Sequence, residues 1–187
     1  MLKRKFVALL RFVPKLLAVV AGITLIFDIA CLILGNMGYW VNVTNSMPVG
    51  VYREESGDIK KDNYVLLCKD DYELNRAKND DYLCKDGHMP LLKRVVAVKN
   101  DVVTVSNEGV YVNYTKLENS ERIVNSWLNE KNLLDYTLKD KEFLVMGRSP
   151  YSWDSRYFGI VRRDEFISKV VPVFLVFSKY EDLHFNY

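Results

Sequence analysis

The sequence predicts a mainly β domain that follows one N-terminal transmembrane helix. The helix is predicted from an apolar run of 19 residues, Leu16–Leu34, which at about 1.5 Å per residue extends about 28 Å, close to the thickness of a bilayer core. The β domain is predicted from short β-branched runs, separated by turn residues, that follow the apolar run. A chain of 187 residues, 49% of them hydrophobic, suits one membrane segment and one compact domain.

The residues before the apolar run are basic, and five of them carry positive charge: Lys3, Arg4, Lys5, Arg11 and Lys15. This bias predicts that residues 1–15 lie in the cytoplasm, that 16–35 form a single-pass anchor in the cytoplasmic (inner) membrane, and that 36–187 form an extracytoplasmic, periplasmic-side domain. Asp28 interrupts the run at a cost of about 2.5–3.5 kcal/mol, which the neighbouring aliphatic residues offset. A cleavable secretory signal is the alternative interpretation, although the run is long for one and no Ala-x-Ala site follows.

The charge of the chain argues against a nucleic-acid partner. The formal net charge is +2, but the basic residues before the apolar run supply more than this, so the remainder is slightly acidic. A domain of that charge lacks the basic surface that binds nucleic acid. The lipid bilayer is the partner that the sequence predicts.

Three cysteines are present, and their spacing is not that of a zinc site. Cys31 falls in the apolar run, whereas Cys68 and Cys84 flank Lys69–Asp86, a polar stretch predicted to be an exposed loop or irregular helix. Two interpretations of the pair stay open: unrelated thiols, or, in an oxidising compartment, a disulfide that contributes about 3 kcal/mol. No metal site and no cofactor are expected.

The β domain is predicted from apolar and β-branched runs in chain order. Strands are expected at Asn63–Cys68, Leu91–Val98, Lys141–Gly147 and within Asp164–Ser178. The last run is too short, and too interrupted by Pro172, to be a second membrane span. It is predicted to pack on the core, with contact to the membrane surface as the alternative.

A hairpin and a helix are predicted between these strands. Asp101–Ser106 and Gly109–Asn113 alternate in polarity around Asn107-Glu-Gly, a typical hairpin signal. Asn119–Asp135 has helical spacing of its apolar residues, which are Ile123, Val124, Trp127, Leu128 and Leu134. It is predicted to be a short amphipathic helix, either packed on the domain or exposed to a partner.

Ser46 is the candidate nucleophile, in the segment Asn42–Arg53 that follows the apolar run. Pro48 and Gly50 predict a turn leading into a strand, which would expose the serine. Even fully extended, the chain between Leu34 and Ser46 reaches only about 40 Å, so the serine is expected near the outer membrane face.

A serine hydroxyl needs a base to act as a nucleophile. The two histidines, His88 and His184, would be needed for a Ser-His-Asp triad, which stays an alternative. Lys93 is the favoured base because it lies in the apolar run Leu91–Val98, where a charged residue is rarely buried without a reason.

Three motifs carry a family resemblance: Ser46-Met-Pro, Lys93-Arg-Val-Val-Ala and Gly147-Arg-Ser-Pro-Tyr-Ser-Trp-Asp-Ser-Arg-Tyr-Phe-Gly159. In order and spacing they resemble the three boxes of the signal peptidase I superfamily. The pattern Thr44-x-Ser46-x-Pro48-x-Gly50-x-Tyr52 most resembles the conjugative transfer (TraF-type) branch, whose members mature pilin precursors. The resemblance covers residues 40 to 175 and implies a domain of coiled antiparallel β-sheets.

The resemblance implies a Ser/Lys dyad in which Ser46 attacks the scissile carbonyl and Lys93 is general base and then general acid. Burial must lower the pKa of Lys93 so that a neutral amine is available. The Ser46 N–H and the Thr44 hydroxyl match the oxyanion hole of relatives, although Thr44 is equally an ordinary β-branched strand residue. Ser152 matches a serine that bonds the catalytic lysine.

Asp154 and Arg156 resemble a pair that braces the site together with the arginine after the lysine, here Arg94. The alternative for this pair is a surface ion pair of little energetic value. The third box begins Gly147-Arg-Ser-Pro instead of the usual Gly-Asp-Asn-Arg, which favours a specialised branch. Lys99-Asn-Asp101 replaces the usual Pro-Gly-Asp and leaves the chemistry of that turn open.

The implied substrate is an exported precursor protein, a pilin or another transfer protein, from which a signal or leader peptide is removed. Its small residues before the cut would enter shallow pockets shaped by residues beside the dyad, namely Met47, Pro48, Val49, Leu92 and Val95. The alternatives are a general signal peptidase I and a non-catalytic membrane-anchored adaptor with a peptidase-like fold. Self-cleaving repressors share the Ser/Lys chemistry, but the anchor and the missing basic helix argue against them.

Overall fold

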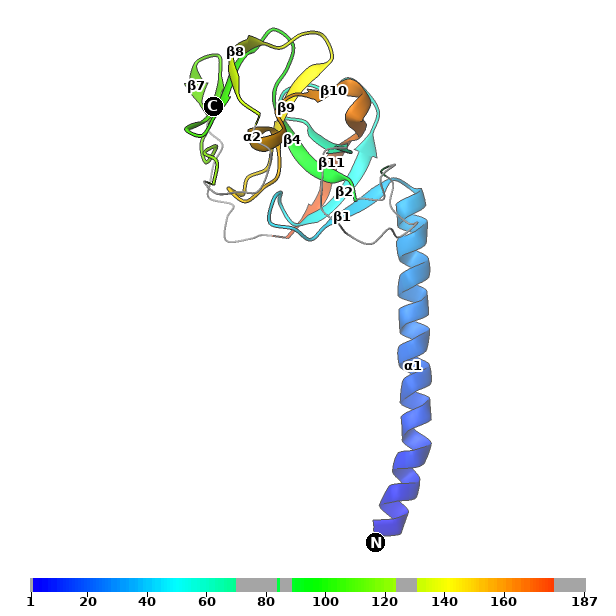
Figure 1. Ribbon diagram of the computed structural model, residues 1–187. Helices are drawn as coiled ribbons and strands as arrows, with labels where there is room; N and C mark the ends of the chain where they lie inside the picture. Colours follow the sequence, from blue (N-terminus) through cyan, green and yellow to red (C-terminus); the bar gives the residue numbers. More distant parts are fainter. Residues whose placement is uncertain (1, 70–83, 85–88, 124–130, 177–187) are drawn as a thin grey trace. The chain divides into compact units, whose positions relative to one another are not determined.

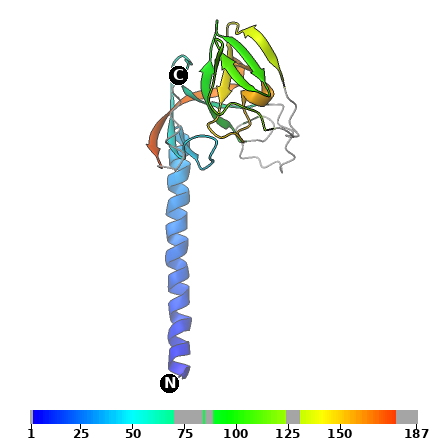
Figure 2. The ribbon, with the colours of Figure 1, turned by 90° about the vertical axis from the view of Figure 1, so that its left-hand side faces the viewer.

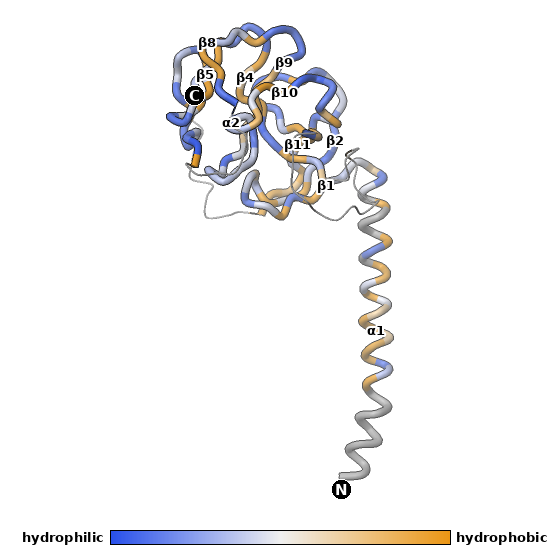
Figure 3. Tube along the Cα trace, viewed as in Figure 1, coloured by the Kyte–Doolittle hydropathy of each residue, from blue (hydrophilic) through white to orange (hydrophobic). Residues whose placement is uncertain are grey.

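The computed structural model describes residues 2–69, 84, 89–123 and 131–176 and divides into two units, Met1–Trp40 and Val41–Tyr187 (Figure 1). The first unit contains helix α1 (Leu2–Asn36), which includes the whole apolar run. The helix thus begins well before the predicted anchor and also takes in Pro14. Figure 3 colours most of its described residues from Val13 onward as hydrophobic.

Among the residues that the structure describes, no helix meets the length and hydropathy of a membrane span. The transmembrane anchor stays a prediction from the sequence.

The second unit is built on a seven-stranded sheet. Its strands follow the order β1 (Tyr39–Asn42), β2 (Gly50–Glu55), β11 (Phe166–Leu175), β3 (Tyr64–Leu67), β4 (Leu91–Ala97), β9 (Glu142–Met146) and β10 (Val161–Arg162). The pairings from β2 to β10 in this order are antiparallel. The predicted strands at Asn63–Cys68, Leu91–Val98, Lys141–Gly147 and Asp164–Ser178 are confirmed, as is a mainly β domain.

A second, four-stranded antiparallel sheet contains β7 (Thr115–Lys116), β6 (Gly109–Val112), β5 (Val102–Ser106) and β8 (Leu133–Thr137), in that order. Figure 2 shows these green and yellow strands together on one side of the domain. The predicted hairpin is confirmed, because Ser106 pairs with Gly109 across the Asn107-Glu108 turn.

The hydrophobic core occupies both faces of β4 and β9. On one face, Val96, Leu144 and Met146 pack with the buried valines of the four-stranded sheet: Val103, Val105, Val110 and Val112. On the other face, Val95 and Val145 pack with an aromatic group composed of Phe143, Phe158 and Phe166. Lys93 and Val95 share this second face because alternate residues of a strand point the same way.

Strand β11 lies between β2 and β3, where a proline is unusual. Its pairing with β3 ends at Val170, whereas Pro172 continues the pairing with β2, opposite Tyr52. The proline therefore lies where one neighbouring strand has already ended. At Gly50 a Cβ atom would lie 2.2 Å from the Phe174 carbonyl oxygen, so the close approach of β11, rather than a turn conformation, requires glycine there.

The predicted helix at Asn119–Asp135 is wrong in the described residues. Residues 119–123 are not helical, and Leu133–Asp135 belong to β8. The buried Arg122 donates hydrogen bonds to the backbone oxygens of Lys131 and Arg156. These bonds hold residues 119–123 against other parts of the domain in a conformation that is not helical. Val124, Trp127 and Leu128 lie outside the described residues.

Two open questions of the sequence are settled. Cys68 and Cys84 form a disulfide with Cα atoms 5.6 Å apart, whereas most of the polar stretch between them lies outside the described residues.

In the turn at Lys99-Asn-Asp101, Asn100 adopts the left-handed conformation with φ of 72° and donates its N–H to the Leu138 oxygen. Asparagine tolerates this conformation better than most residues, which explains how it replaces glycine.

Candidate active site

Ser46 lies, half-buried, in the turn Thr44–Val49 between β1 and β2, as predicted. Its Oγ is 2.9 Å from Thr44 Oγ1, so the two hydroxyls are hydrogen-bonded. Within the described part of the chain, no acceptor is found for the Ser46 N–H. The Ser46 N–H is thus a donor of the kind that an oxyanion hole requires, whereas the Thr44 hydroxyl donates to Asn42 Oδ1 in this structure.

Lys93 lies in the middle of β4 and is only 3% exposed. Burial lowers its pKa from 10.5 to about 8, the negative charge of Asp154 opposes this shift, and the positive charge of Arg156 adds to it. With a pKa near 8, about one lysine in ten is neutral at pH 7, compared with about one in 2,500 for a free side chain. The predicted depression of the lysine pKa is confirmed in direction.

Gly147 connects the lysine strand to the serine turn. Arg94 pairs with Met146 in antiparallel register, so Lys93 lies beside Gly147, the residue after β9. A Cβ atom on Gly147 would lie 2.7 Å from the Ser46 carbonyl oxygen and 2.2 Å from Ser152 Oγ. The three motifs predicted from the sequence therefore meet at this glycine.

Ser152 is buried, and among the described residues its Oγ has no hydrogen-bond partner. A buried hydroxyl without a partner is costly and is expected at functional sites. Ser152 lies against Gly147, which is beside Lys93, but the predicted hydrogen bond from this serine to the lysine is not formed in the structure, and the orienting role stays a prediction.

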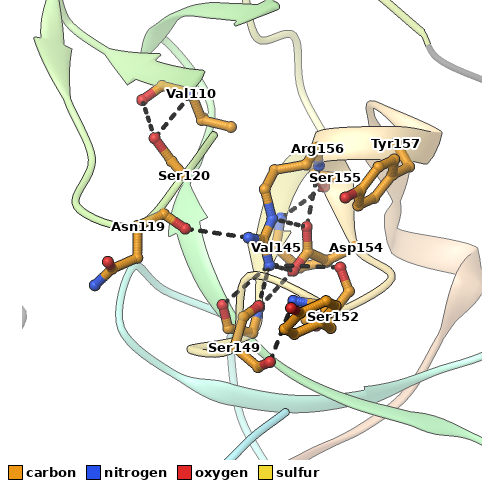
Figure 4. Close-up of polar contacts among 12 residues, drawn as sticks. Val110, Asn119, Ser120, Val145, Ser149, Ser152, Asp154, Ser155, Arg156 and Tyr157 are labelled. Carbon is orange, nitrogen blue, oxygen red and sulfur yellow. Dashed lines mark hydrogen bonds and ion pairs between the residues drawn. The ribbon is translucent and has the colours of Figure 1, made fainter. Parts of the chain in front are cut away.

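Asp154 and Arg156 form a fully buried ion pair, with 2.6 Å between Asp154 Oδ2 and Arg156 Nη2 (Figure 4). Asp154 Oδ2 also accepts a hydrogen bond from the Gly147 N–H at 2.8 Å, which fixes the backbone beside Lys93. The guanidinium donates further bonds to the Ser149 and Asn119 carbonyl oxygens. The alternative of a surface ion pair is thus wrong, and the pair organises the third motif from inside.

Arg94 lies on the strand face opposite to Lys93 and donates a hydrogen bond of 2.9 Å to Asp62 Oδ1. Half of the Asp62 side chain is exposed. The bracing of the site by Arg94 stays a prediction.

The residues predicted to contact substrate differ in exposure. Pro48 and Val49 are half-buried, whereas Met47 and Leu92 are almost completely covered. Val95 is fully buried in the aromatic core cluster, so its side chain is not at a surface, contrary to the expectation. Pro48 and Val49 are the accessible members of the set.

Sequence reasoning assigned no role to two residues that hold the serine turn from the flanking strands, Asn42 at the end of β1 and Tyr52 in β2. Asn42 is 9% exposed and donates hydrogen bonds from Nδ2 to three carbonyl oxygens of the turn. Tyr52 is fully buried, donates to the Pro48 oxygen at 2.7 Å, and has a pKa raised by that burial. The only signal for Asn42 was its place two residues before Thr44, which is typical of an Asx turn.

The histidine alternative is not tested, because His88 and His184 lie outside the described residues. In the described part of the chain, no cluster of three His, Cys, Asp or Glu side chains could hold a metal ion.

Comparison with known proteins identifies one family. Residues 6–175 match the model described as "Signal peptidase, peptidase S26". The plasmid transfer protein TraF of Escherichia coli is 34% identical over 173 residues, covering 85% of this chain and 97% of that protein. Signal peptidase IB of Staphylococcus aureus is 26% identical over 71% of this chain and 70% of its own length. Among solved structures, a signal peptidase I from Enterococcus faecalis V583 aligns with a TM-score of 0.38 and 16% identity, over 63% of this chain and 100% of that chain.

Proposed function

Because this chain belongs to the peptidase S26 family of signal peptidases, we propose that it is a membrane-anchored serine endopeptidase with a Ser46/Lys93 dyad. It removes the signal or leader peptide of an exported precursor, on the extracytoplasmic side of the cytoplasmic membrane. One observation carries the proposal: a buried lysine with a pKa of about 8 lies beside Gly147, against which the serine turn packs.

In the proposed reaction, neutral Lys93 takes the hydroxyl proton of Ser46 while Oγ attacks the scissile carbonyl carbon. The Ser46 N–H stabilises the negative charge on the carbonyl oxygen, and the Thr44 hydroxyl supplies a second donor when it turns from Asn42 Oδ1 to that oxygen. Protonated Lys93 then gives its proton to the leaving amine, and a water molecule hydrolyses the acyl-enzyme with Lys93 again as base. Ser152 orients the lysine, and Asp154 with Arg156 holds the backbone on which it rests.

The substrate class is proposed from the relatives. Two plasmid transfer proteins are 34% identical to this chain, and the chain covers 97% and 89% of their lengths. A pilin precursor or another protein of plasmid transfer is therefore the proposed substrate. The similarity to signal peptidase IB supports a second candidate, a general signal peptidase, and complementation of a strain that lacks its housekeeping enzyme distinguishes the two.

The proposal is tested by incubating the membrane-reconstituted protein with a precursor encoded by a neighbouring gene and mapping the new termini by mass spectrometry. Ser46→Ala and Lys93→Ala should each abolish cleavage, because the dyad acts as a unit. Lys93→Arg should also fail, since arginine stays protonated. Wild-type rates from Lys93→Ala would refute the dyad.

Matched controls separate chemistry from folding. Ser56→Ala removes an exposed serine, and Lys99→Ala removes an exposed lysine paired with Asp140, just beyond the end of β4. Both should keep wild-type cleavage. A folded wild-type protein that cleaves no precursor would favour the non-catalytic adaptor.

A further inference from the structure

Hydrogen-bond donors outside the serine turn (Thr44–Val49) hold its backbone in place. Each backbone carbonyl from Thr44 to Pro48 accepts a hydrogen bond from one of three side chains or from the Arg148 backbone. The donors are Asn42 Nδ2 to the Thr44, Met47 and Pro48 oxygens, Tyr52 Oη to the Pro48 oxygen, Arg148 N to the Ser46 oxygen and Arg148 Nε to the Asn45 oxygen. Asn42 makes more of these bonds than any other side chain.

Both ends of the Asn42 amide are used, which fixes its orientation. Nδ2 lies 3.0 Å from each of three carbonyl oxygens, which can only accept, and its two hydrogens are shared among them. Oδ1 accepts hydrogen bonds from the Thr44 N–H at 3.1 Å and from Thr44 Oγ1 at 2.8 Å. A flipped amide would lose all of these contacts.

The Asn42 oxygen also determines the direction of the hydroxyl hydrogen bonds. Thr44 has a single hydroxyl proton and donates it to Asn42 Oδ1, which has no proton to give. The bond of 2.9 Å between the Thr44 and Ser46 hydroxyls is then donated by Ser46. In this structure the protons therefore point from Ser46 to Thr44 and from Thr44 to Asn42, and the Ser46 proton turns to Lys93 in the proposed reaction.

We propose that Asn42 is a positioning residue for the reaction of Ser46, holding the backbone of the serine turn and orienting the Thr44 hydroxyl that contacts the nucleophile. This inference rests on the proposed peptidase function. Asn42 does not touch the reacting atoms and acts through Thr44 and the turn. A misplacement of about 1 Å at a reacting group can lower the rate by about 10²-fold, which sets the expected effect.

The test measures kcat and KM for precursor cleavage by the full-length protein and its variants. Asn42→Ala should lower kcat by about 10²-fold and change KM by less than about threefold, because the groups that it misplaces, the Ser46 and Thr44 hydroxyls, act in the transition state. Asn42→Asp is a second, isosteric variant. It keeps Oδ1 but replaces Nδ2 by an oxygen, which cannot donate to the three carbonyl oxygens. It should lower kcat at least as much as Asn42→Ala does.

The control is Asn107→Ala, which removes an asparagine that accepts a bond from Arg122 at the hairpin turn, away from the serine. It should lower the melting temperature without changing kcat. A double-mutant cycle supplies a readout that a purely structural role would not affect. Thr44→Val should reduce kcat by a smaller factor in the Asn42→Ala background than in the wild-type protein, because the second hydroxyl is then already misplaced.

The outcomes are distinguishable. If wild-type protein cleaves the precursor and Asn42→Ala retains kcat within about threefold, the inference is wrong and the proposed function stands. The same holds if both Asn42 variants affect only KM, or if the effects of Asn42→Ala and Thr44→Val multiply independently. If wild-type protein cleaves nothing, the proposed function fails and this inference fails with it.

Discussion

The backbone N–H of Arg148 donates a hydrogen bond of 2.8 Å to the carbonyl oxygen of Ser46. This bond joins the turn that carries the nucleophile to the segment that follows β9, although the two are far apart in the sequence. Gly147 precedes Arg148 and directly follows β9, beside Lys93 of β4. The position of the serine relative to the lysine thus depends on backbone contacts at residues 147 and 148.

Gly147→Ala should abolish precursor cleavage while leaving the protein folded. An added Cβ would lie 2.7 Å from the Ser46 oxygen and 2.2 Å from Ser152 Oγ, so the serine turn or Ser152 must move. A shift of about 1 Å is enough to lower the rate by about 10²-fold. Cleavage rate and circular dichroism spectra measure the two effects separately.

Gly22→Ala is the matched control for this substitution. A Cβ at Gly22 meets nothing within 4 Å, and alanine favours a helix more than glycine does. Cleavage should be unchanged. Wild-type activity in Gly147→Ala would show that the contact between the two motifs is not needed.

Cleavage should increase with pH through a midpoint near 8. The reaction needs the neutral amine of Lys93, and burial lowers the pKa of this lysine to about 8. The pH dependence of kcat/KM measures this group in the free enzyme. A midpoint near the ordinary lysine value of 10.5, or none in this range, would contradict Lys93 as the base.

The same pKa has a consequence for stability. Between pH 8 and 10.5 the unfolded chain binds a proton at Lys93 that the folded protein has lost. The contribution of Lys93 to the free energy of unfolding should therefore rise with pH across this window. Denaturant titrations of wild type and Lys93→Met should show the rise in the wild-type protein and less of it in the variant.

Asp154→Asn should move the midpoint of the pH profile to lower pH. The negative charge of Asp154 raises the pKa of Lys93, against the larger effect of burial, so its removal leaves the neutral amine more favoured. The measurement is kcat/KM against pH for the variant and the wild type. A midpoint that moves upward would mean that Asp154 does not act on Lys93 through its charge.

Asp154→Ala should be strongly destabilising, by about 3–5 kcal/mol, because it leaves the buried Arg156 guanidinium without its carboxylate. The control is Asp164→Ala, which removes an ion pair with Arg162 whose two side chains are mostly exposed. It should change the free energy of unfolding by no more than about 1 kcal/mol. Equal effects in urea titrations would contradict the buried role of Asp154.

Much of the fold could be predicted because local patterns determine it. The apolar run around Lys93 became the buried strand β4, and the Asn107-Glu-Gly signal became the hairpin of β5 and β6. The pairing of β11 between β2 and β3 could not be predicted, since it joins segments from opposite ends of the domain. The helix predicted at Asn119–Asp135 failed for the same reason: Arg122 binds backbone that is close only in the folded chain.

The residues of the candidate site that could be predicted are those whose side chains have known chemistry. The residues that the prediction missed act through contacts with the backbone. Ser46, Lys93 and Asp154 carry groups whose roles a motif can name. Asn42 contributes by donating to carbonyl oxygens, which every residue has, so no sequence pattern marks its partners. Val95 was misjudged because alternation along a strand predicts its face but not what covers that face.

The disulfide provides the last prediction, which concerns the compartment of the domain. Cys68 and Cys84 are bonded in the structure and separated by 16 positions in the sequence. Disulfides persist in oxidising compartments and are rare in the cytosol, so the bond agrees with the topology that the basic N-terminal flank predicts. In cells, both cysteines should resist alkylation by a thiol reagent until a reductant is added.

The topology can be measured independently by fusing alkaline phosphatase after Lys60, which should give an active enzyme because this phosphatase folds only outside the cytoplasm. Cys68→Ser should lower the free energy of unfolding by about 3 kcal/mol through loss of the loop constraint. Cys31→Ser, outside the pair, is the control and should not change the stability of the domain. An inactive but expressed fusion together with freely alkylated Cys68 and Cys84 would place the domain in the cytoplasm. The proposed access to exported precursors would then be lost, because substrate and serine would lie on opposite sides of the membrane.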